Sequence, residues 1–150
     1  MRFLLVDRID ELTPGVRIRG AKQVAMSEDV LEHHFPGRPV FPGVLVLEAM
    51  VQLAGWLEAA SSGFTTTVLL AGVGRAAFYA LARPGDRLDI EVEQVSPAGE
   101  SRRSYRGVAR VDGARQAVIE LEGEVVPLDE LEDPAMVRAR LAWLARQRRW

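Results

Sequence analysis

Two hydrophobic patterns divide the chain. From Val44 to about Ala60 the sequence is apolar nearly all round, with leucine, alanine and methionine rather than a β-branched majority. Its length and composition predict a helix that is buried on most sides and ends at Ser61-Ser62-Gly63. From Thr65 onward apolar and polar residues alternate, which is typical of strands with one buried face. The pattern therefore predicts one central helix and a sheet supplied largely by the second half of the chain.

Turn signals separate the alternating segments. Arg83-Pro84-Gly85-Asp86, Ser96–Glu100 and Asp112-Gly113 each combine residues that favour tight turns. The strands predicted between these turns form an antiparallel meander and cover residues 65–78, 88–92, 105–111 and 118–126. Upstream, the pattern predicts a short strand or helical turn at 3–6, a strand at 16–26 and a short helix at 28–33.

The last segment has the signals of a separate amphipathic helix. Asp133-Pro134 provides a helix start, and Val137, Leu141 and Leu144 share one face. We expect this helix to dock on the surface of the domain; a basic docking face for an acidic partner is the alternative. We therefore divide the chain into a domain at residues 1–128 and a helical tail at 129–150.

Composition narrows the class of protein. The chain has 150 residues and a net charge of −2, which suits one globular domain and gives no case for nucleic acid. The charge is uneven, because residues 134–150 carry +5 and the remainder 14 − 21 = −7. With no cysteine, a disulfide framework, a thiolate metal site and a cysteine nucleophile are excluded. The start of the chain resembles neither a signal peptide nor an anchor, and we expect a cytoplasmic protein with no membrane insertion.

Candidate proton chemistry is concentrated in one run, HHFPGRPVFPGVLVLEAMVQLAG. The only two histidines, His33 and His34, precede the long helix, and that helix carries Glu48. Glu48 and Gln52 are four residues apart and therefore share a helical face, where the Gln52 amide can hold the carboxyl group. Apolar neighbours would favour the neutral carboxylic acid, which can donate a proton. A histidine base and a carboxylic acid suit the elimination or addition of water.

The start of the long helix is a candidate binding element. Pro42-Gly43 begins it, and the first amides of a helix have no partner within the helix. The N–H groups of Gly43 and Val44 can therefore face a substrate oxygen as negative charge develops on it. Gly43 has no side chain, which we expect to let the substrate approach. No metal-ligand spacing or phosphate-binding glycine loop is found.

This run resembles a known family signature. His34-Phe35-Pro36-Gly37-Arg38-Pro39-Val40-Phe41-Pro42-Gly43-Val44-Leu45, followed by Glu48-Ala49 and Gln52, is similar to the motif of the (3R)-hydroxyacyl-acyl-carrier-protein dehydratases of FabZ type. The similarity extends to FLLVDRI near the start, LAGVGRAAF at 70–78, the PGDRL turn and the VDG hairpin. It covers about residues 2–126 and leaves the tail outside.

The resemblance implies an α+β hot-dog fold, in which an antiparallel sheet wraps one long central helix; the C-terminal amphipathic helix is an addition. It implies dehydration of 3-hydroxyacyl thioesters in fatty acid or related lipid or polyketide synthesis, without metal or redox cofactor, on phosphopantetheine of an acyl carrier protein. His34 would remove the C2 proton, and Glu48 would help the 3-hydroxyl group leave as water. Gly43 would bind the thioester carbonyl and Gln52 would orient Glu48; Val44, Phe35 and Pro42 complete the substrate-binding set.

The resemblance also implies a homodimer with sites formed across the interface, often assembled as a trimer of dimers, so that His34 and Glu48 of one chain lie apart. One residue and one segment depart from the family pattern. His33 replaces a small residue, and we treat it as structural. The segment RAAFYAL at 75–81 has fewer basic residues than the family uses to meet its carrier, and the arginine-rich tail is a candidate substitute. The alternatives are a hot-dog thioesterase and a non-catalytic acyl-binding subunit.

Overall fold

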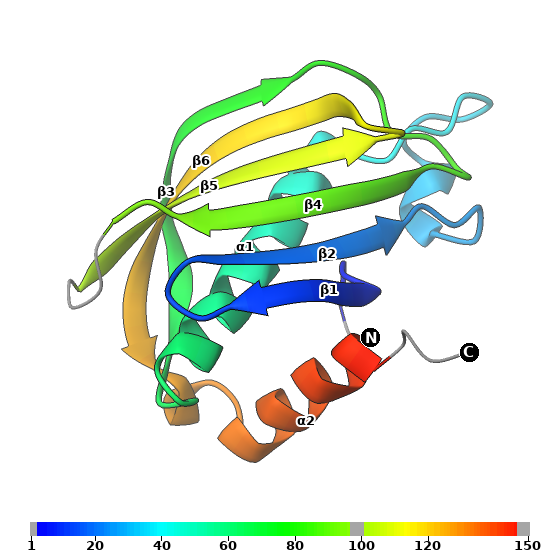
Figure 1. The fold of residues 1–150 in the computed structure, drawn as a ribbon. Coiled ribbons are helices and arrows are strands. Elements are labelled where there is room, and N and C mark those ends of the chain that lie inside the picture. The colour runs from blue at the N-terminus through cyan, green and yellow to red at the C-terminus, as the bar shows by residue number, and fades with distance from the viewer. Residues whose placement is uncertain (1–2, 97–100, 147–150) are drawn as a thin grey trace.

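Six antiparallel strands curve around one long helix in a computed structural model of the chain, which describes residues 3–96 and 101–146 (Figure 1). The helix is α1 (Gly43–Ser61), and a second helix, α2 (Pro134–Arg146), lies below the sheet. The strands are β1 (Arg8–Thr13), β2 (Arg17–Gln23), β3 (Thr66–Phe78), β4 (Arg87–Gln94), β5 (Arg102–Val111) and β6 (Ala114–Pro127). This is the hot-dog arrangement, so the predicted fold class is confirmed.

The sheet has the order β1-β2-β4-β5-β6-β3, which leaves β1 and β3 at its two edges. β5 and β6 form the hairpin predicted at Asp112-Gly113, where both residues have positive φ angles of 48° and 81°. The alternation predicted for β4 is also present, because Leu88, Ile90 and Val92 are buried.

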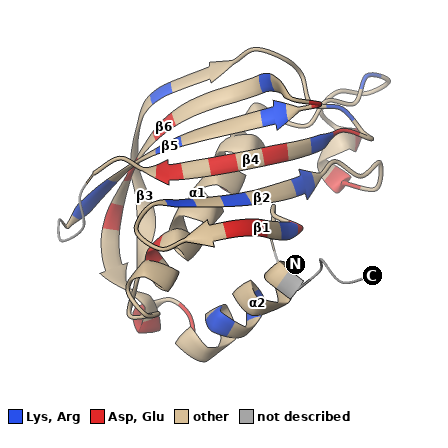
Figure 2. Ribbon diagram, in the orientation of Figure 1, with Lys and Arg blue, Asp and Glu red and all other residues tan. Residues whose placement is uncertain are grey.

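The outer face of the sheet pairs opposite charges across strands. The β2–β4 register places Arg17 opposite Glu93 and Arg19 opposite Glu91, and the Arg19 guanidinium lies 3.4 Å from the Glu91 carboxylate. In Figure 2 the positions of the acidic residues along β4 (red) lie beside those of the basic residues of β2 (blue). Cross-strand pairs of this kind contribute modestly to stability and fix the register of the two strands.

The buried face of α1 fills the concave side of the sheet. Val46, Met50, Leu53 and Leu57 are fully buried there. β5 approaches α1 closely at Gly107, since a Cβ atom added to Gly107 would overlap the Met50 side chain. Within the described part of the chain, α1 is also the one helix long and apolar enough to cross a membrane. Because it packs against the sheet, it is the core helix of this fold.

The first strand lies later in the chain than the sequence predicted. Residues 3–6 form no strand, since the backbone of Phe3 and Leu5 bonds to the Gln52 side chain instead. The strand is β1, a polar edge segment in which Ile9 is the only fully buried side chain, so its hydrophobic signal is weak. The short helix predicted at 28–33 is a 3₁₀ turn, η1 (Asp29–Glu32). Most of the predicted Ser96–Glu100 turn lies outside the described residues.

The tail forms the predicted helix and docks on the domain. Val137 and Leu144 of α2 are buried, and Leu141 packs beside them. A second 3₁₀ turn, η2 (Leu128–Glu130), connects β6 to this helix. The docked position confirms the expectation that the helix covers the protein's own surface (Figure 1).

Candidate active site

His34 lies in the turn after η1 with its tautomer defined by the backbone. Its Nδ1 atom is 2.8 Å from the Val40 carbonyl oxygen. Because a carbonyl oxygen only accepts hydrogen bonds, Nδ1 donates, and in the neutral ring Nε2 carries the free electron pair. The imidazole also stacks on the Phe35 ring, with centroids 4.1 Å apart. The partly buried ring is therefore held with the Nε2 electron pair available to accept a proton. His33, in contrast, is exposed.

A cavity of about 500 Å³ brings His34 together with the start of α1. Four of the predicted site residues line it, namely His34, Phe35, Gly43 and Val44. The remaining wall comes from residues that the sequence analysis did not assign to the site: Arg38, Val40, Phe41, Phe78, Ala80, Leu81 and Gln116. The walls of this cavity are mostly apolar, and His34 on them is a group that can accept a proton.

The N-terminus of α1 has the predicted geometry. Pro42 is the N-cap residue, and its carbonyl oxygen accepts bonds from Leu45 and Val46. The Gly43 and Val44 amides precede these donors and so lack intrahelical partners. Pro42 itself is buried and does not line the cavity.

The physical reason for glycine at position 43 differs from the predicted one. An added Cβ atom would lie 2.8 Å from Cε1 of Phe78. Glycine therefore lets the Phe78 ring pack over the helix start, and this ring, rather than open space, faces the position.

Glu48 and Gln52 form the predicted pair. Gln52 Nε2 donates to Glu48 Oε1 at 2.9 Å and also to the Phe3 carbonyl oxygen at 2.9 Å. The Leu5 amide donates to Gln52 Oε1 at 3.0 Å. Gln52 thus fixes one carboxylate oxygen and also connects the start of the chain to α1. Glu48 is only partly buried in the single chain.

A single chain does not place His34 and Glu48 in one cavity. The cavity around His34 contains neither Glu48 nor Gln52, and Gln52 lines a second cavity between α1, β3 and α2. The two halves of the candidate site therefore occupy different parts of the chain.

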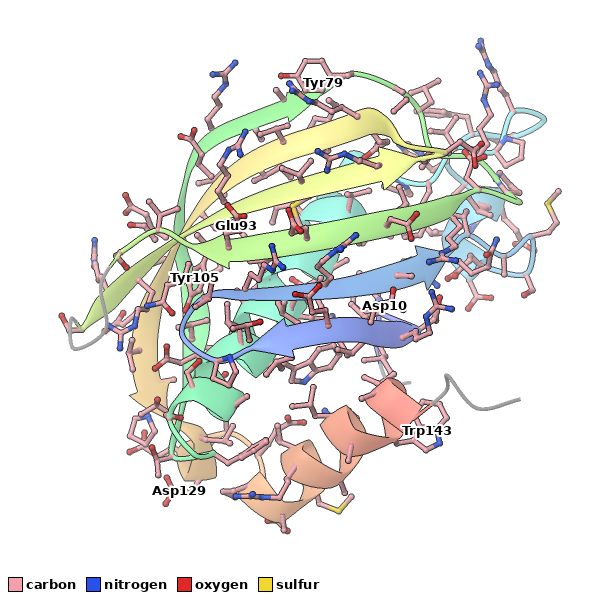
Figure 3. All side chains as sticks on the ribbon, viewed as in Figure 1. Asp10, Tyr79, Glu93, Tyr105, Asp129 and Trp143 are labelled. Atoms are coloured by element: carbon pink, nitrogen blue, oxygen red, sulfur yellow. The ribbon has the colours of Figure 1, made fainter. Side chains whose placement is uncertain are left out.

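The buried acid of α1 is Glu58, which the sequence analysis did not single out. Its Oε2 atom lies 3.2 Å from Nε of Arg103, and Thr66 donates to its Oε1 atom at 2.9 Å. Tyr105 (labelled in Figure 3) is buried, and this burial, followed by the Glu58 charge, raises the pKa of its phenol. Glu58 ends the apolar run, so only its partners on β3 and β5 distinguish it from a solvated helix end.

Gln116 is a second group that the sequence did not reveal. Its Nε2 donates to the Ala80 carbonyl oxygen at 3.0 Å, while its buried Oε1 has no protein partner among the described residues. It lines the cavity around His34. No sequence pattern marks it, because it is one polar position in an alternating strand.

Two tail arginines make contacts within the chain. The Arg138 guanidinium lies over the Phe64 ring, 4.3 Å from its centroid, and Arg140 pairs with Glu132 at 3.2 Å. Arg148 and Arg149 lie outside the described residues. Within residues 3–96 and 101–146, no group of three acidic, histidine or cysteine side chains is placed to hold a metal ion.

A curved antiparallel sheet around a core helix, with an oriented histidine at that helix's N-terminus, defines a hot-dog protein with a candidate acid–base site. The chain belongs to the FabA-like family, whose domain matches residues 1–122.

Curated proteins with similar sequences support the assignment of the chain to this family. The 3-hydroxyacyl-[acyl-carrier-protein] dehydratase FabZ of Myxococcus xanthus is 42% identical over 130 residues, covering 85% of this chain and 84% of that protein. The protein of the same name from Syntrophotalea carbinolica is 39% identical over 130 residues, covering 83% and 86%.

Solved structures share the fold at low sequence identity. A chain of a dehydratase heterocomplex from Xenorhabdus doucetiae has a TM-score of 0.59 at 16% identity, covering 76% of this chain and 92% of that one. A thioesterase from Haemophilus influenzae has a TM-score of 0.61 at 14% identity, covering 82% and 79%. These likenesses concern the fold alone.

Proposed function

We propose that the protein dehydrates (3R)-3-hydroxyacyl thioesters, carried on acyl carrier protein, to trans-2-enoyl thioesters. The observation that carries the proposal is the oriented His34 imidazole in a cavity that also holds the Gly43 and Val44 amides. The names of the curated relatives describe the same activity for those proteins. We assign the reaction to fatty acid or related lipid or polyketide synthesis in the cytoplasm.

The reaction uses side chains and backbone amides alone. His34 Nε2 accepts the C2 proton, and the Gly43 and Val44 amides bind the thioester oxygen as enolate charge develops. Glu48 gives its proton to the 3-hydroxyl group, the C3–O bond breaks, and water leaves with the double bond formed between C2 and C3. Proton return from His34 to Glu48 through solvent restores the starting state. The substrate arrives on the phosphopantetheine of its carrier, and the chain supplies no cofactor of its own.

The complete site requires a homodimer in this proposal. β3 is an edge strand of 13 residues, and Leu69, Leu70 and Val73 along it are exposed. An unpaired apolar edge of this length is suited to pairing with a second copy. Antiparallel β3–β3 pairing would cover these side chains. A trimer of such dimers is the larger assembly that we propose.

The arrangement of α1 along β3 supports a shared site. Gly43 lies against Phe78, at the end of β3, and Gly55 lies against Thr67, at its start. Phe78 lines the cavity around His34, whereas Thr67 lines the cavity that contains Gln52. Antiparallel pairing of two β3 strands would bring the His34 end of one protomer beside the Gln52 end of its partner. Each site would then combine His34 of one chain with Glu48 of the other.

Dehydration of a 3-hydroxyacyl carrier thioester, followed at the enoyl absorbance, tests the proposal. We expect activity in the unaltered protein and its loss in His34→Ala and Glu48→Gln. His33→Ala is the matched control, because His33 is the exposed neighbour of the proposed base, and it should retain activity. Full rates in His34→Ala and Glu48→Gln would refute the assigned roles. Release of free thiol in excess of enoyl product would favour the thioesterase, and no turnover at all would favour the acyl-binding subunit.

A further inference from the structure

A second cavity lies between α1, β3 and α2. Its volume of about 740 Å³ falls within the range of roughly 300–1,000 Å³ that small-molecule sites occupy. Its walls are predominantly apolar, and the polar members are Gln52, Thr67 and the paired side chains of Glu132 and Arg140. The apolar side chains on the α2 side of the cavity include Leu131, Met136, Val137 and Trp143.

α2 is anchored firmly but does not fill this space. Val137 and Leu144 are buried, whereas Met136 and Trp143, on the cavity wall, are 51% and 59% exposed. Trp143 lies near the C-terminal end of the helix (Figure 3). Helices that serve only to cover a core pack without large voids. An anchored helix beside an open apolar cavity therefore indicates a ligand site, since exposed apolar surface of this kind is usually functional.

The cavity adjoins the residue that holds the proposed catalytic acid. Gln52 forms part of its wall, and the same amide group donates to Glu48. Phe3, whose carbonyl oxygen also accepts from Gln52, lines the wall beside it. We infer from this shared residue that an acyl chain whose reacting carbons lie at Glu48 would extend past Gln52 into the cavity.

We propose that this cavity holds the distal, apolar end of the acyl chain and that α2 determines which chain lengths the enzyme accepts. The assignment rests on the proposed dehydratase function, which supplies the acyl substrate. α2 lies beyond residue 122, where the family match ends, so the selectivity belongs to this chain rather than to the family domain. Met136, Ala139 and Trp143 are the residues through which the helix acts.

A matched pair of tryptophan substitutions on α2 tests this assignment. Ala139 lines the cavity, whereas Ala142 is exposed on the same helix and does not line it. The readout is the ratio of kcat/KM for 3-hydroxydecanoyl and 3-hydroxybutyryl pantetheine thioesters. Each buried methylene group contributes about fourfold in binding, so Ala139→Trp should lower the ratio by at least about tenfold. Ala142→Trp should leave this ratio unchanged. Trp143→Ala enlarges the cavity and should raise the ratio, in favour of the longer chain.

Fluorescence gives a second measurement that does not depend on turnover. In a Trp56→Phe protein, a saturated acyl-pantetheine with a terminal bromine should quench tryptophan emission saturably, and the quenching should be lost when Trp143 is also replaced by phenylalanine. This quenching measurement tests the cavity assignment even if the Ala139→Trp protein does not fold. Absence of quenching at saturating ligand would overturn the cavity assignment.

The outcomes separate the two proposals. If the unaltered protein dehydrates neither thioester, the proposed function fails, and the quenching experiment alone decides what the cavity binds. If dehydration is observed but Ala139→Trp and Ala142→Trp give the same ratio, only the role of α2 is wrong. If Ala139→Trp changes the sedimentation coefficient and not the ratio, the cavity receives a second protein surface instead of an acyl chain.

Discussion

Replacing Gln52 by leucine tests whether Gln52 acts by holding the Glu48 carboxyl group or only by filling space. Leucine has a similar size but removes the hydrogen bonds to Phe3, Leu5 and Glu48. Each such bond contributes about 0.5–1.5 kcal/mol net, so the free energy of unfolding should fall by about 2–4 kcal/mol. Because a small misplacement of a reacting group can cost about a hundredfold in rate, kcat should fall roughly ten- to hundredfold. KM should change little, since the thioester-binding amides of Gly43 and Val44 remain in place.

The control for this variant is Gln23→Leu. The Gln23 amide donates to the carbonyl oxygens of Gly85 and Asp86, both at 3.1 Å, and Gln23 lines neither of the two cavities. Its loss should lower stability by about 1–2 kcal/mol and leave kcat unchanged. Stability is measured by urea unfolding, and kcat by enoyl formation at a temperature where both variants are folded. Equal kcat values in Gln52→Leu and the unaltered protein would show that Gln52 only fastens the start of the chain.

Three further predictions concern the core. Gly107→Ala should lower the free energy of unfolding by about 1–3 kcal/mol in urea, because its Cβ atom would overlap the buried Met50 side chain; an unchanged midpoint would contradict the packing described. Glu58→Leu removes the carboxylate that pairs with the buried Arg103 and should lower the free energy of unfolding by about 1–3 kcal/mol, whereas the Glu58→Leu/Arg103→Met double variant should recover part of that loss; equal losses in both proteins would refute the pairing. Burial raises the pKa of Tyr105 in the folded state, so folding favours the protonated phenol: its contribution is fully present below the unfolded pKa of about 10 and is lost as the pH rises further. Stability should therefore fall above about pH 10 in the unaltered protein and fall less steeply in Tyr105→Phe, as measured by thermal unfolding across that range.

The sequence predicted the elements with strong periodicity and missed contacts that depend on tertiary packing. The apolar run of α1, the alternation of β4 and the Asp112-Gly113 turn each carry a local signal, and each is present. β1 is a polar edge strand and has no such signal. The apolar segment at 3–6 predicts a short strand or helical turn, but a side chain 47 residues away from Leu5 takes up its amide.

The candidate site divides in the same way. The pairing of Glu48 with Gln52 could be predicted from their spacing alone. His34 could be identified as a candidate from the motif in which it lies. Three other features could not be predicted, because they depend on how distant segments pack. They are the Val40 carbonyl that orients His34, the Phe78 ring over Gly43 and the Gln116 oxygen without a protein partner among the described residues. Among the described residues, the acid that is buried within one chain is Glu58, since burial on a helix that is apolar nearly all round is decided by the strands facing each position.

The most direct test of the account mixes two inactive proteins. His34→Ala and Glu48→Gln chains carrying different affinity tags are produced together, and the mixed dimers are isolated on both tags in turn. In a site shared between protomers, the intact His34 of one chain meets the intact Glu48 of the other, so one site in two is complete and roughly half of the unaltered dehydratase rate should return. A mixed dimer as inactive as its two parents would contradict the shared site.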